Sequence, residues 1–176
     1  MRLPRTLEFL RRTRLWQAAS DARYLLRHQH RREFFRTLVA PNSLVFDIGA
    51  NVGHYAILFA SIGGRVLAIE PQSALVSGLH RRFAAPPIRV LRTALGPTPS
   101  TATLHKAPGL PEIASLRADV AARRRFAAEH LFSDSETVPV TIDALVAEHG
   151  TPDFCKIDVE GFELAVLAGL TRPSLA

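Results

Sequence analysis

Residues 44–61, LVFDIGANVGHYAILFAS, decide the fold, because a short run of strand formers passes through two glycines into a helical stretch. Leu44 to Ile48 is apolar and rich in β-branched and aromatic residues, which predicts a buried strand. Gly49 and Gly53 let the backbone turn tightly, and Tyr55 to Ser61 predicts a helix. A strand, a glycine turn and a helix in this order are typical of the first unit of an open α/β sheet.

The alternation of strand and helix continues beyond this unit. We expect a second strand at Arg65–Ile69, a helix at about Ser73–Phe83 and a third strand at Ile88–Leu91, with breaks at Gly63-Gly64 and Pro86-Pro87. Strands that alternate with helices at this spacing are joined by right-handed crossovers, so the sheet is predicted to be parallel.

Further elements are expected in the less regular second half of the chain. In order they are a strand near Thr101–His105, a helix at Arg117–Leu131, a short strand at Val138–Ile142, a helix at Ala144–His149, a fourth core strand at Phe154–Val159 and a helix at Phe162–Leu170. Pro139 favours an edge or irregular position for its strand. Asp143 stands where the N-cap of the next helix belongs.

The composition indicates one globular domain preceded by a basic arm. A chain of 176 residues with 47% hydrophobic content can bury a single core. Ten of the 22 basic residues lie within residues 1–36 against three acidic ones, so the arm carries the net positive charge. Apolar residues recur every three or four positions from Leu3 to Leu38, which predicts one or two amphipathic helices. We therefore divide the chain into an arm, residues 1–40, and a domain, residues 41–176.

The arm and the lone cysteine bear on partners and location. An arginine-rich amphipathic helix is usually a solvated cap packed on its domain; the alternatives are a peripheral membrane contact or an acidic-substrate contact. No apolar run approaches the roughly 20 residues of a membrane-spanning helix. Cys155 alone supports neither a disulfide framework nor a Cys-rich zinc site, which fits a reducing cytoplasm, and no metal is expected.

The glycine turn also indicates which ligand the sheet binds. Glycines let a ligand approach the backbone, and the following helix supplies free N–H groups. The dinucleotide fingerprint G-x-G-x-x-G is absent, because Asn51 occupies its second glycine position. A pyrophosphate would press against that position, so Asn51 argues against an NAD-dependent oxidoreductase. A turn that only packs strand against helix is the alternative.

Charged residues at the ends of two predicted strands add to this pattern. Glu70 follows the second strand, where an acid can accept both hydroxyls of an adenosine ribose. Lys156, Asp158 and Glu160 alternate with apolar residues, so they point to one side if the fourth strand persists. Buried charges in a central strand are costly unless paired, so they form either a ligand site or a structural ion-pair network. Cys155 is interpreted as a small core residue.

Taken together, these motifs resemble the FkbM family of methyltransferases over about residues 40–170. The segments that carry the resemblance are VFDIGANVG at 45–53, AIEP at 68–71, TIDAL at 141–145, KIDVEGFE at 156–163 and VLAG at 166–169. The resemblance implies a Rossmann-like methyltransferase fold, an α/β arrangement of a mostly parallel sheet with helices on both faces. It also implies S-adenosylmethionine as cofactor and an acceptor hydroxyl on a sugar, secondary metabolite or other small molecule.

The resemblance assigns roles residue by residue. The methionine end of the cofactor would be lined by Asp47, Gly49, Asn51 and Gly53, the ribose by Glu70, and the adenine by segments 94–96 and 114–116, which include Ser115. Thr93 departs from the family pattern, which more often has Asn there. The family pattern also continues into a fifth strand and a terminal hairpin beyond Ala176, so we expect a truncated product that lacks the C-terminal strands.

Methyl transfer to a hydroxyl needs donor and acceptor in line and benefits from a base. Asp158 is the candidate base, with Lys156 or Glu160 orienting it, and His54 is the second candidate. Two other functions stay open: a non-catalytic methyltransferase-like protein, and a nucleic-acid methyltransferase suggested by the arm. The fourth strand lacks the Asn/Asp-Pro-Pro-aromatic motif of base amino-group methylation, which disfavours a nucleic-acid partner.

Overall fold

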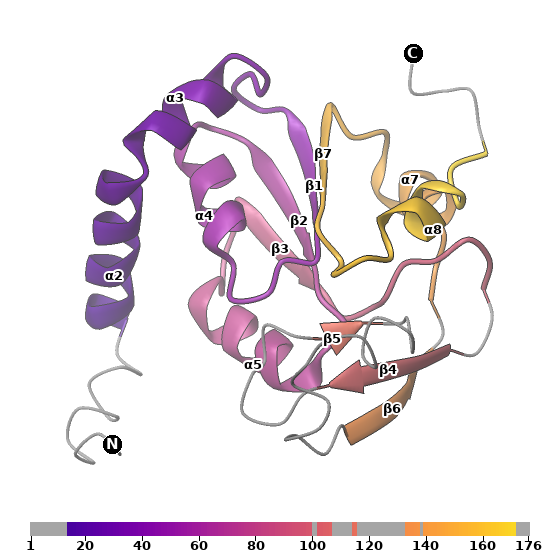
Figure 1. Ribbon diagram of the computed structural model, residues 1–176. Coiled ribbons are helices and arrows are strands. Elements are labelled where there is room, and N and C mark those ends of the chain that lie inside the picture. The colour runs from indigo at the N-terminus through magenta and orange to yellow at the C-terminus, as the bar shows by residue number, and fades with distance from the viewer. Residues whose placement is uncertain (1–13, 100–101, 107–113, 116–132, 138, 172–176) are drawn as a thin grey trace.

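The computed structural model describes residues 14–99, 102–106, 114–115, 133–137 and 139–171 (Figure 1). Its centre is a four-stranded sheet of order β3-β2-β1-β7 in which every neighbouring pair is parallel. The strands are β1 (Leu44–Ile48), β2 (Arg65–Ile69), β3 (Ile88–Leu91) and β7 (Phe154–Ile157). The first three coincide with the strands predicted from sequence, and the α/β Rossmann-like fold class is confirmed.

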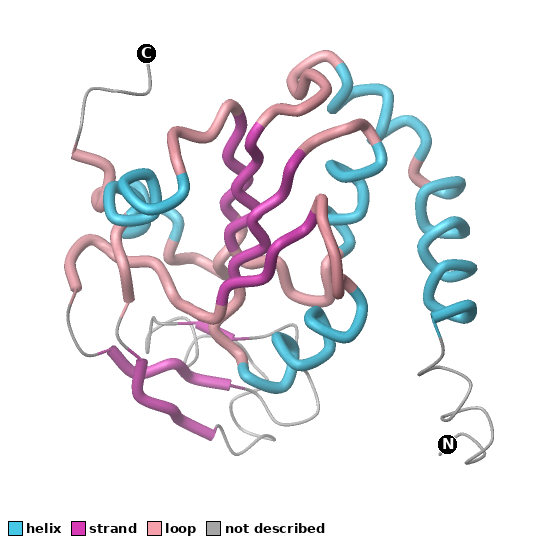
Figure 2. Tube along the Cα trace, turned by 180° about the vertical axis from the view of Figure 1, so that it is seen from behind, coloured by secondary structure: helices cyan, strands magenta, loops and turns pink. Residues whose placement is uncertain are grey.

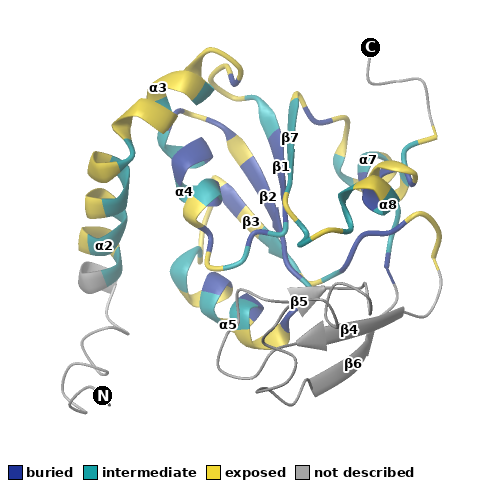
Figure 3. Cartoon of the chain, viewed as in Figure 1, coloured by how far each residue is buried: buried dark blue, intermediate teal, exposed yellow. Residues whose placement is uncertain are grey.

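Helices cover both faces of this sheet and enclose two apolar layers (Figure 3). The helices are α4 (His54–Ser61), α5 (Ser73–Arg82), α7 (Ile142–His149) and α8 (Glu163–Leu167). Val45 of β1 packs with Phe59 of α4 in one layer, whereas its neighbour Phe46 packs with Ile142 and Val166 in the other. Consecutive strand residues enter opposite layers because side chains alternate across a strand.

The arm forms two helices that pack on the domain, α2 (Arg14–Arg27) and α3 (Gln29–Arg36). Phe35 of α3 stacks edge-on against Phe59 and Phe154, with ring centroids 5.1 and 5.8 Å away. Aromatic contacts of this geometry stabilise beyond their buried area. The predicted amphipathic helices are therefore present between residues 14 and 36. Within the part of the chain that the structure describes, none of the helices is both long and apolar enough to cross a bilayer.

A second, smaller sheet lies beyond the carboxyl ends of the parallel strands (Figures 1 and 2). Its strands β4 (Ala102–Lys106), β5 (Ala114–Ser115) and β6 (Ser133–Thr137) are antiparallel in the order β5-β4-β6. The sequence predicted β4 within one residue and missed the other two. The helix expected at residues 117–131 lies outside the described residues.

The structure corrects four boundaries in the C-terminal third. The strand expected at 138–142 is a single bridge between Val140 and Leu95. Thr141, not Asp143, caps α7, because Thr141 is extended and its Oγ1 accepts a 3.1 Å hydrogen bond from Ala144 N–H. Helix α8 spans five residues and not the nine expected.

The fourth correction concerns the charged strand. β7 ends at Ile157, and the chain then turns through Glu160 at φ +56° and Gly161 at φ +94°. The alternation that would put Lys156, Asp158 and Glu160 on one side of a strand therefore stops after Lys156. Left-handed backbone at two successive residues is incompatible with a continuing strand.

Candidate functional site

A buried carboxylate and a lysine face each other near the carboxyl ends of β1 and β7. Asp47 of β1 and Lys156 of β7 are register partners, and Lys156 Nζ lies 3.3 Å from Asp47 Oδ1. Asp47 is fully buried, and the Lys156 side chain is 13% exposed. Burial raises the pKa of Asp47, and the Lys156 ammonium opposes that shift in part. The structural ion pair expected as one interpretation of these charges is present.

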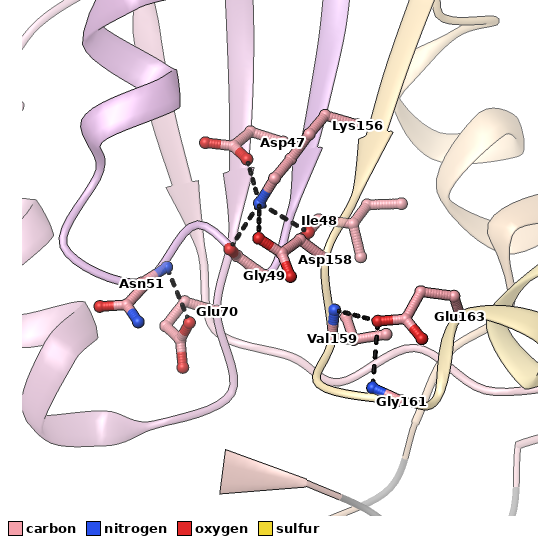
Figure 4. Close-up of polar contacts among 10 residues, drawn as sticks. All are labelled: Asp47, Ile48, Gly49, Asn51, Glu70, Lys156, Asp158, Val159, Gly161 and Glu163. Atoms are coloured by element: carbon pink, nitrogen blue, oxygen red, sulfur yellow. Dashed lines mark hydrogen bonds and ion pairs between the residues drawn. The ribbon is translucent and has the colours of Figure 1, made fainter. Parts of the chain in front are cut away.

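Lys156 also ties the glycine turn to the end of β7 (Figure 4). Its Nζ donates to the carbonyl of Gly49 at 3.0 Å and lies 3.6 Å from Asp158 Oδ2. The ring of Tyr55 in α4 stands 5.2 Å from the ammonium, within the range of a cation–π contact. One cation thus joins the carboxyl ends of both strands and the first turn of α4.

The two glycines of the turn are required by protein packing. A Cβ on Gly49, whose φ is +76°, would lie 1.9 Å from the carbonyl oxygen of Asp158. A Cβ on Gly53, at φ +83°, would meet Phe83 and Leu79 of the α5 region at 2.6 and 2.9 Å. The room that both glycines leave is therefore occupied by neighbouring protein atoms. This gives the packing interpretation of the turn direct support, independently of any ligand.

Glu70 lies at the end of β2 and is held against the same turn. Its Oε2 accepts a 2.9 Å hydrogen bond from Asn51 N–H, and its Oε1 accepts one of 3.0 Å from Gln72 N–H. The side chain is buried, which raises its pKa, and the two backbone N–H groups oppose the shift. Asn51 adopts φ +51°, a left-handed conformation that Asn tolerates better than most residues. The strand-terminal acid is thus part of the turn and not a solvated side chain.

The other charged residues after β7 differ in their surroundings. Asp158 is largely exposed at 62%, and its N–H continues the ladder to Ile48. Glu163 Oε1 accepts hydrogen bonds from Val159 and Gly161 N–H at 3.0 and 3.1 Å and so fixes the loop that carries Glu160 (Figure 4). This loop-fixing role of Glu163 was not predicted. An acid two residues after a Glu-Gly pair is the signal that could have indicated it.

Two further expectations concern single residues. Cys155 packs in the apolar layer of α7 and α8, and burial raises the pKa of its thiol to about 12. This supports its interpretation as a core residue. His54, the second candidate base, is the first residue of α4, and its ring stacks on Tyr24 of the arm.

The predicted cofactor residues come together in part. The structure brings Asp47, Gly49, Asn51, Gly53 and Glu70 to the carboxyl ends of β1 and β2, the edge where open α/β sheets bind ligands. Segment 94–96 follows β3, where Leu95 bridges to Val140. Ser115 lies in β5 of the small sheet, paired with His105. A cavity of about 190 Å³ lined by Leu44, Pro87 and His149 lies at the opposite end of the strands.

Unsatisfied polar atoms at this edge fit the methionine end of S-adenosylmethionine. Asp47 Oδ2 and the side-chain oxygen of Asn51 are buried and accept no hydrogen bond of ordinary geometry from the described residues, whereas Asp47 Oδ1 faces the Lys156 ammonium. Buried acceptors of this kind are uncommon in folded proteins, and each needs an explanation. An ammonium or another donor on a ligand would satisfy them.

These features define the class of the protein: a Rossmann-like α/β domain with acidic acceptors at the carboxyl ends of its first two strands. Sequence comparison then supplies the family. The methyltransferase FkbM domain matches residues 47–175, and the chain belongs to that family. A search of curated proteins found no match.

Solved structures with partial likeness to the chain carry methyltransferase descriptions. A protein described as a methyltransferase from an antibiotic biosynthesis pathway of Anabaena variabilis ATCC 29413 is 22% identical, with a TM-score of 0.33, over 37% of this chain and 26% of its own. A protein described as an rRNA methylase from Clostridium thermocellum is 14% identical, with a TM-score of 0.34, over 38% of this chain and 39% of its own. The chain thus spans well under half the length of either protein.

Proposed function

We propose that this chain binds S-adenosylmethionine at the carboxyl ends of β1 and β2 and takes part in methyl transfer to a hydroxyl of a small molecule or glycan. The observation that carries the proposal is the position of Glu70. Its carboxylate is held at the end of β2 by Asn51 N–H, beside the glycine turn. A carboxylate has about four acceptor positions, so the hydrogen bonds from Asn51 and Gln72 still leave room on Glu70 for a ribose hydroxyl.

The chain's own residues divide the work of holding the cofactor. Glu70 accepts the ribose hydroxyls, and Asp47 Oδ2 and the side-chain oxygen of Asn51 accept donors at the methionine end. When bound, the cofactor supplies a methyl group activated by a sulfonium. Lys156 keeps the ends of β1 and β7 at a fixed spacing through Gly49 and Asp158, so the bound groups meet a preorganised site.

Asp158 is our candidate for the base that accepts the acceptor's hydroxyl proton. Its carboxylate is exposed at the carboxyl end of β7, and Lys156 lies 3.6 Å away and orients it. Glu160 lies two residues further along the loop that Glu163 holds, where it can contact the acceptor. A general base must come within hydrogen-bond reach of the proton it removes, and an exposed strand-end carboxylate meets that condition for an incoming substrate.

Calorimetric titration with S-adenosylhomocysteine tests the cofactor site. We expect saturable binding by the wild type, at least roughly tenfold weaker binding by Glu70→Ala, and wild-type binding by the control Glu148→Ala, which removes an exposed carboxylate from α7. If the folded wild type does not bind, the proposal is wrong, and a non-catalytic role is favoured. If it binds and Glu70→Ala binds equally well, the site lies elsewhere.

A further inference from the structure

The arm reaches the glycine turn through one arginine. Arg82, the last residue of α5, donates from one guanidinium nitrogen to the carbonyl of Val52 and from another to the carboxylate of Asp21 in α2. Val52 lies between Asn51 and Gly53, in the middle of the turn. The side chains of Arg82 and Asp21 are only 13% and 16% exposed, so solvent screens this ion pair less than it screens a surface pair.

A second contact joins the same helix of the arm to the same turn. Tyr24, three residues after Asp21, stacks on His54 with a centroid separation of 4.4 Å and an interplanar angle of 5°. The ring of His28, one helical turn further on, stacks on Tyr24 at 4.2 Å. His54 begins α4, directly after Gly53. The arm is therefore linked to the turn in two places. Asp21 reaches Val52 through Arg82, and Tyr24 contacts His54 at the start of α4.

Such support bears on Asn51 above all, because a left-handed backbone costs energy at any residue that carries a Cβ. Asn51 and Gly53 have φ values of +51° and +83°, with Val52 between them. In this arrangement the N–H of Asn51 points at Glu70 and donates to it. Conformations of this kind persist when the surrounding structure over-determines them. Arg82 fixes the carbonyl at the centre of the turn, and Asp21 fixes Arg82.

We infer that Asp21 and Arg82 are positioning residues for the cofactor, and that docking of α2 preorganises the glycine turn for binding. The inference rests on the proposed function, because it assigns the arm a role at that same site. It gives the basic arm a function at the turn that needs neither a lipid surface nor an acidic substrate. The Asp21 carboxylate acts through Arg82 and Val52, and it touches no ligand itself.

The test compares S-adenosylhomocysteine affinity in Asp21→Asn with that in the matched control Glu33→Gln. Glu33 also forms an arm ion pair, with Arg36 at 3.3 Å, but that pair is exposed on α3. Loss of a charge-assisted contact that orders the turn should weaken binding roughly tenfold in Asp21→Asn, and Glu33→Gln should match the wild type. Asp21→Glu should recover part of the loss.

A double-mutant comparison and a ligand-free measurement separate positioning from general stability. If Asp21 acts through Arg82, adding Asp21→Asn to Arg82→Ala should not weaken binding further. Without ligand, hydrogen exchange at residues 49–56 should accelerate in Asp21→Asn, while exchange in β2 stays unchanged. If the wild type binds the ligand and Asp21→Asn has the same affinity and the same hydrogen exchange, the inference is wrong but the proposed function is unaffected. Absence of binding by the wild type would instead count against the proposed function.

Discussion

Lys156 of β7 and Asp47 of β1 are register partners, and a 3.3 Å ion pair joins them beside Tyr55 of α4. The same ammonium donates to the carbonyl of Gly49 and approaches Asp158. A cation in this position does two things at once. It offsets the cost of burying the Asp47 carboxylate, and it keeps the ends of two neighbouring strands together at the edge where the ligand is proposed to bind.

Lys156→Met should be strongly destabilising, because it leaves Asp47 buried without its cation. Removing one partner of a buried ion pair costs about 3–5 kcal/mol of unfolding free energy. Urea unfolding at neutral pH measures this loss. The double variant Asp47→Asn/Lys156→Met should be more stable than Lys156→Met alone, because it no longer buries an unpaired charge. Equal stability of the two variants would show that the pair is not coupled.

Gly49→Ala should destabilise the fold by roughly 3 kcal/mol or more, because the new Cβ meets a backbone carbonyl and the residue keeps a left-handed φ. Gly78→Ala is the matched control. Gly78 lies inside α5, where the nearest atom to an added Cβ is an Arg81 side-chain nitrogen at 4.0 Å. That substitution should stabilise by about 0.5–1 kcal/mol, since alanine favours helices. Similar thermal midpoints for both variants would contradict this account of the turn.

The buried acid Asp47 should make stability decrease with rising pH. Its folded-state pKa is raised above the ordinary 3.8, so between the two values the folded state binds more protons than the unfolded state. The free energy of unfolding therefore falls as pH rises through that window and is lowest above the folded-state pKa. Asp47→Asn removes this contribution. Urea unfolding as a function of pH should give a flatter profile for Asp47→Asn than for the wild type, and identical profiles would exclude the effect.

Cys155 should resist alkylation in the folded protein. Burial raises its thiol pKa to about 12, so little thiolate exists at mildly alkaline pH. Iodoacetamide labelling followed by mass spectrometry should be slow in buffer and fast in urea. The control Cys155→Ala/Ser77→Cys moves the thiol to an exposed position on α5 and should be labelled quickly in both conditions. Rapid labelling of the folded wild type would contradict the packing of the partly buried Cys155 against the apolar layer of α7 and α8.

The local pattern of residues 44–91 was sufficient to predict the first three strands and the two helices between them. β1 and β2 are short, mostly apolar strands that are buried along most of their length and adjoin glycine, and β3 follows Pro86-Pro87. In such a segment the hydrophobic pattern and the positions of glycine and proline indicate the same boundaries. The observed helices and strands therefore differ from the predicted ones by at most one residue at either end. The charged residues at the strand ends could also be identified from the sequence, because each follows a run of apolar residues.

The contacts that shape the site could not be read from the same pattern. Lys156 contacts Asp47 across 109 positions of sequence, and only the order of the strands brings them together. β7 ends at Ile157, and the Glu163 carboxylate holds the loop that follows. The link from Asp21 through Arg82 to Val52 joins three separate segments. Strands β5 and β6 lack the apolar alternation that would have predicted them.

The most direct test of the cofactor site is a ¹⁵N NMR titration of the folded chain with S-adenosylhomocysteine. The account predicts that the largest amide shifts occur at residues 49–53 and 70–72, with small shifts around the cavity near Pro87 at the opposite end of the strands. Saturable binding that shifts other residues and leaves Gly49, Asn51 and Glu70 unperturbed would contradict it, as would the absence of any shift at saturating ligand.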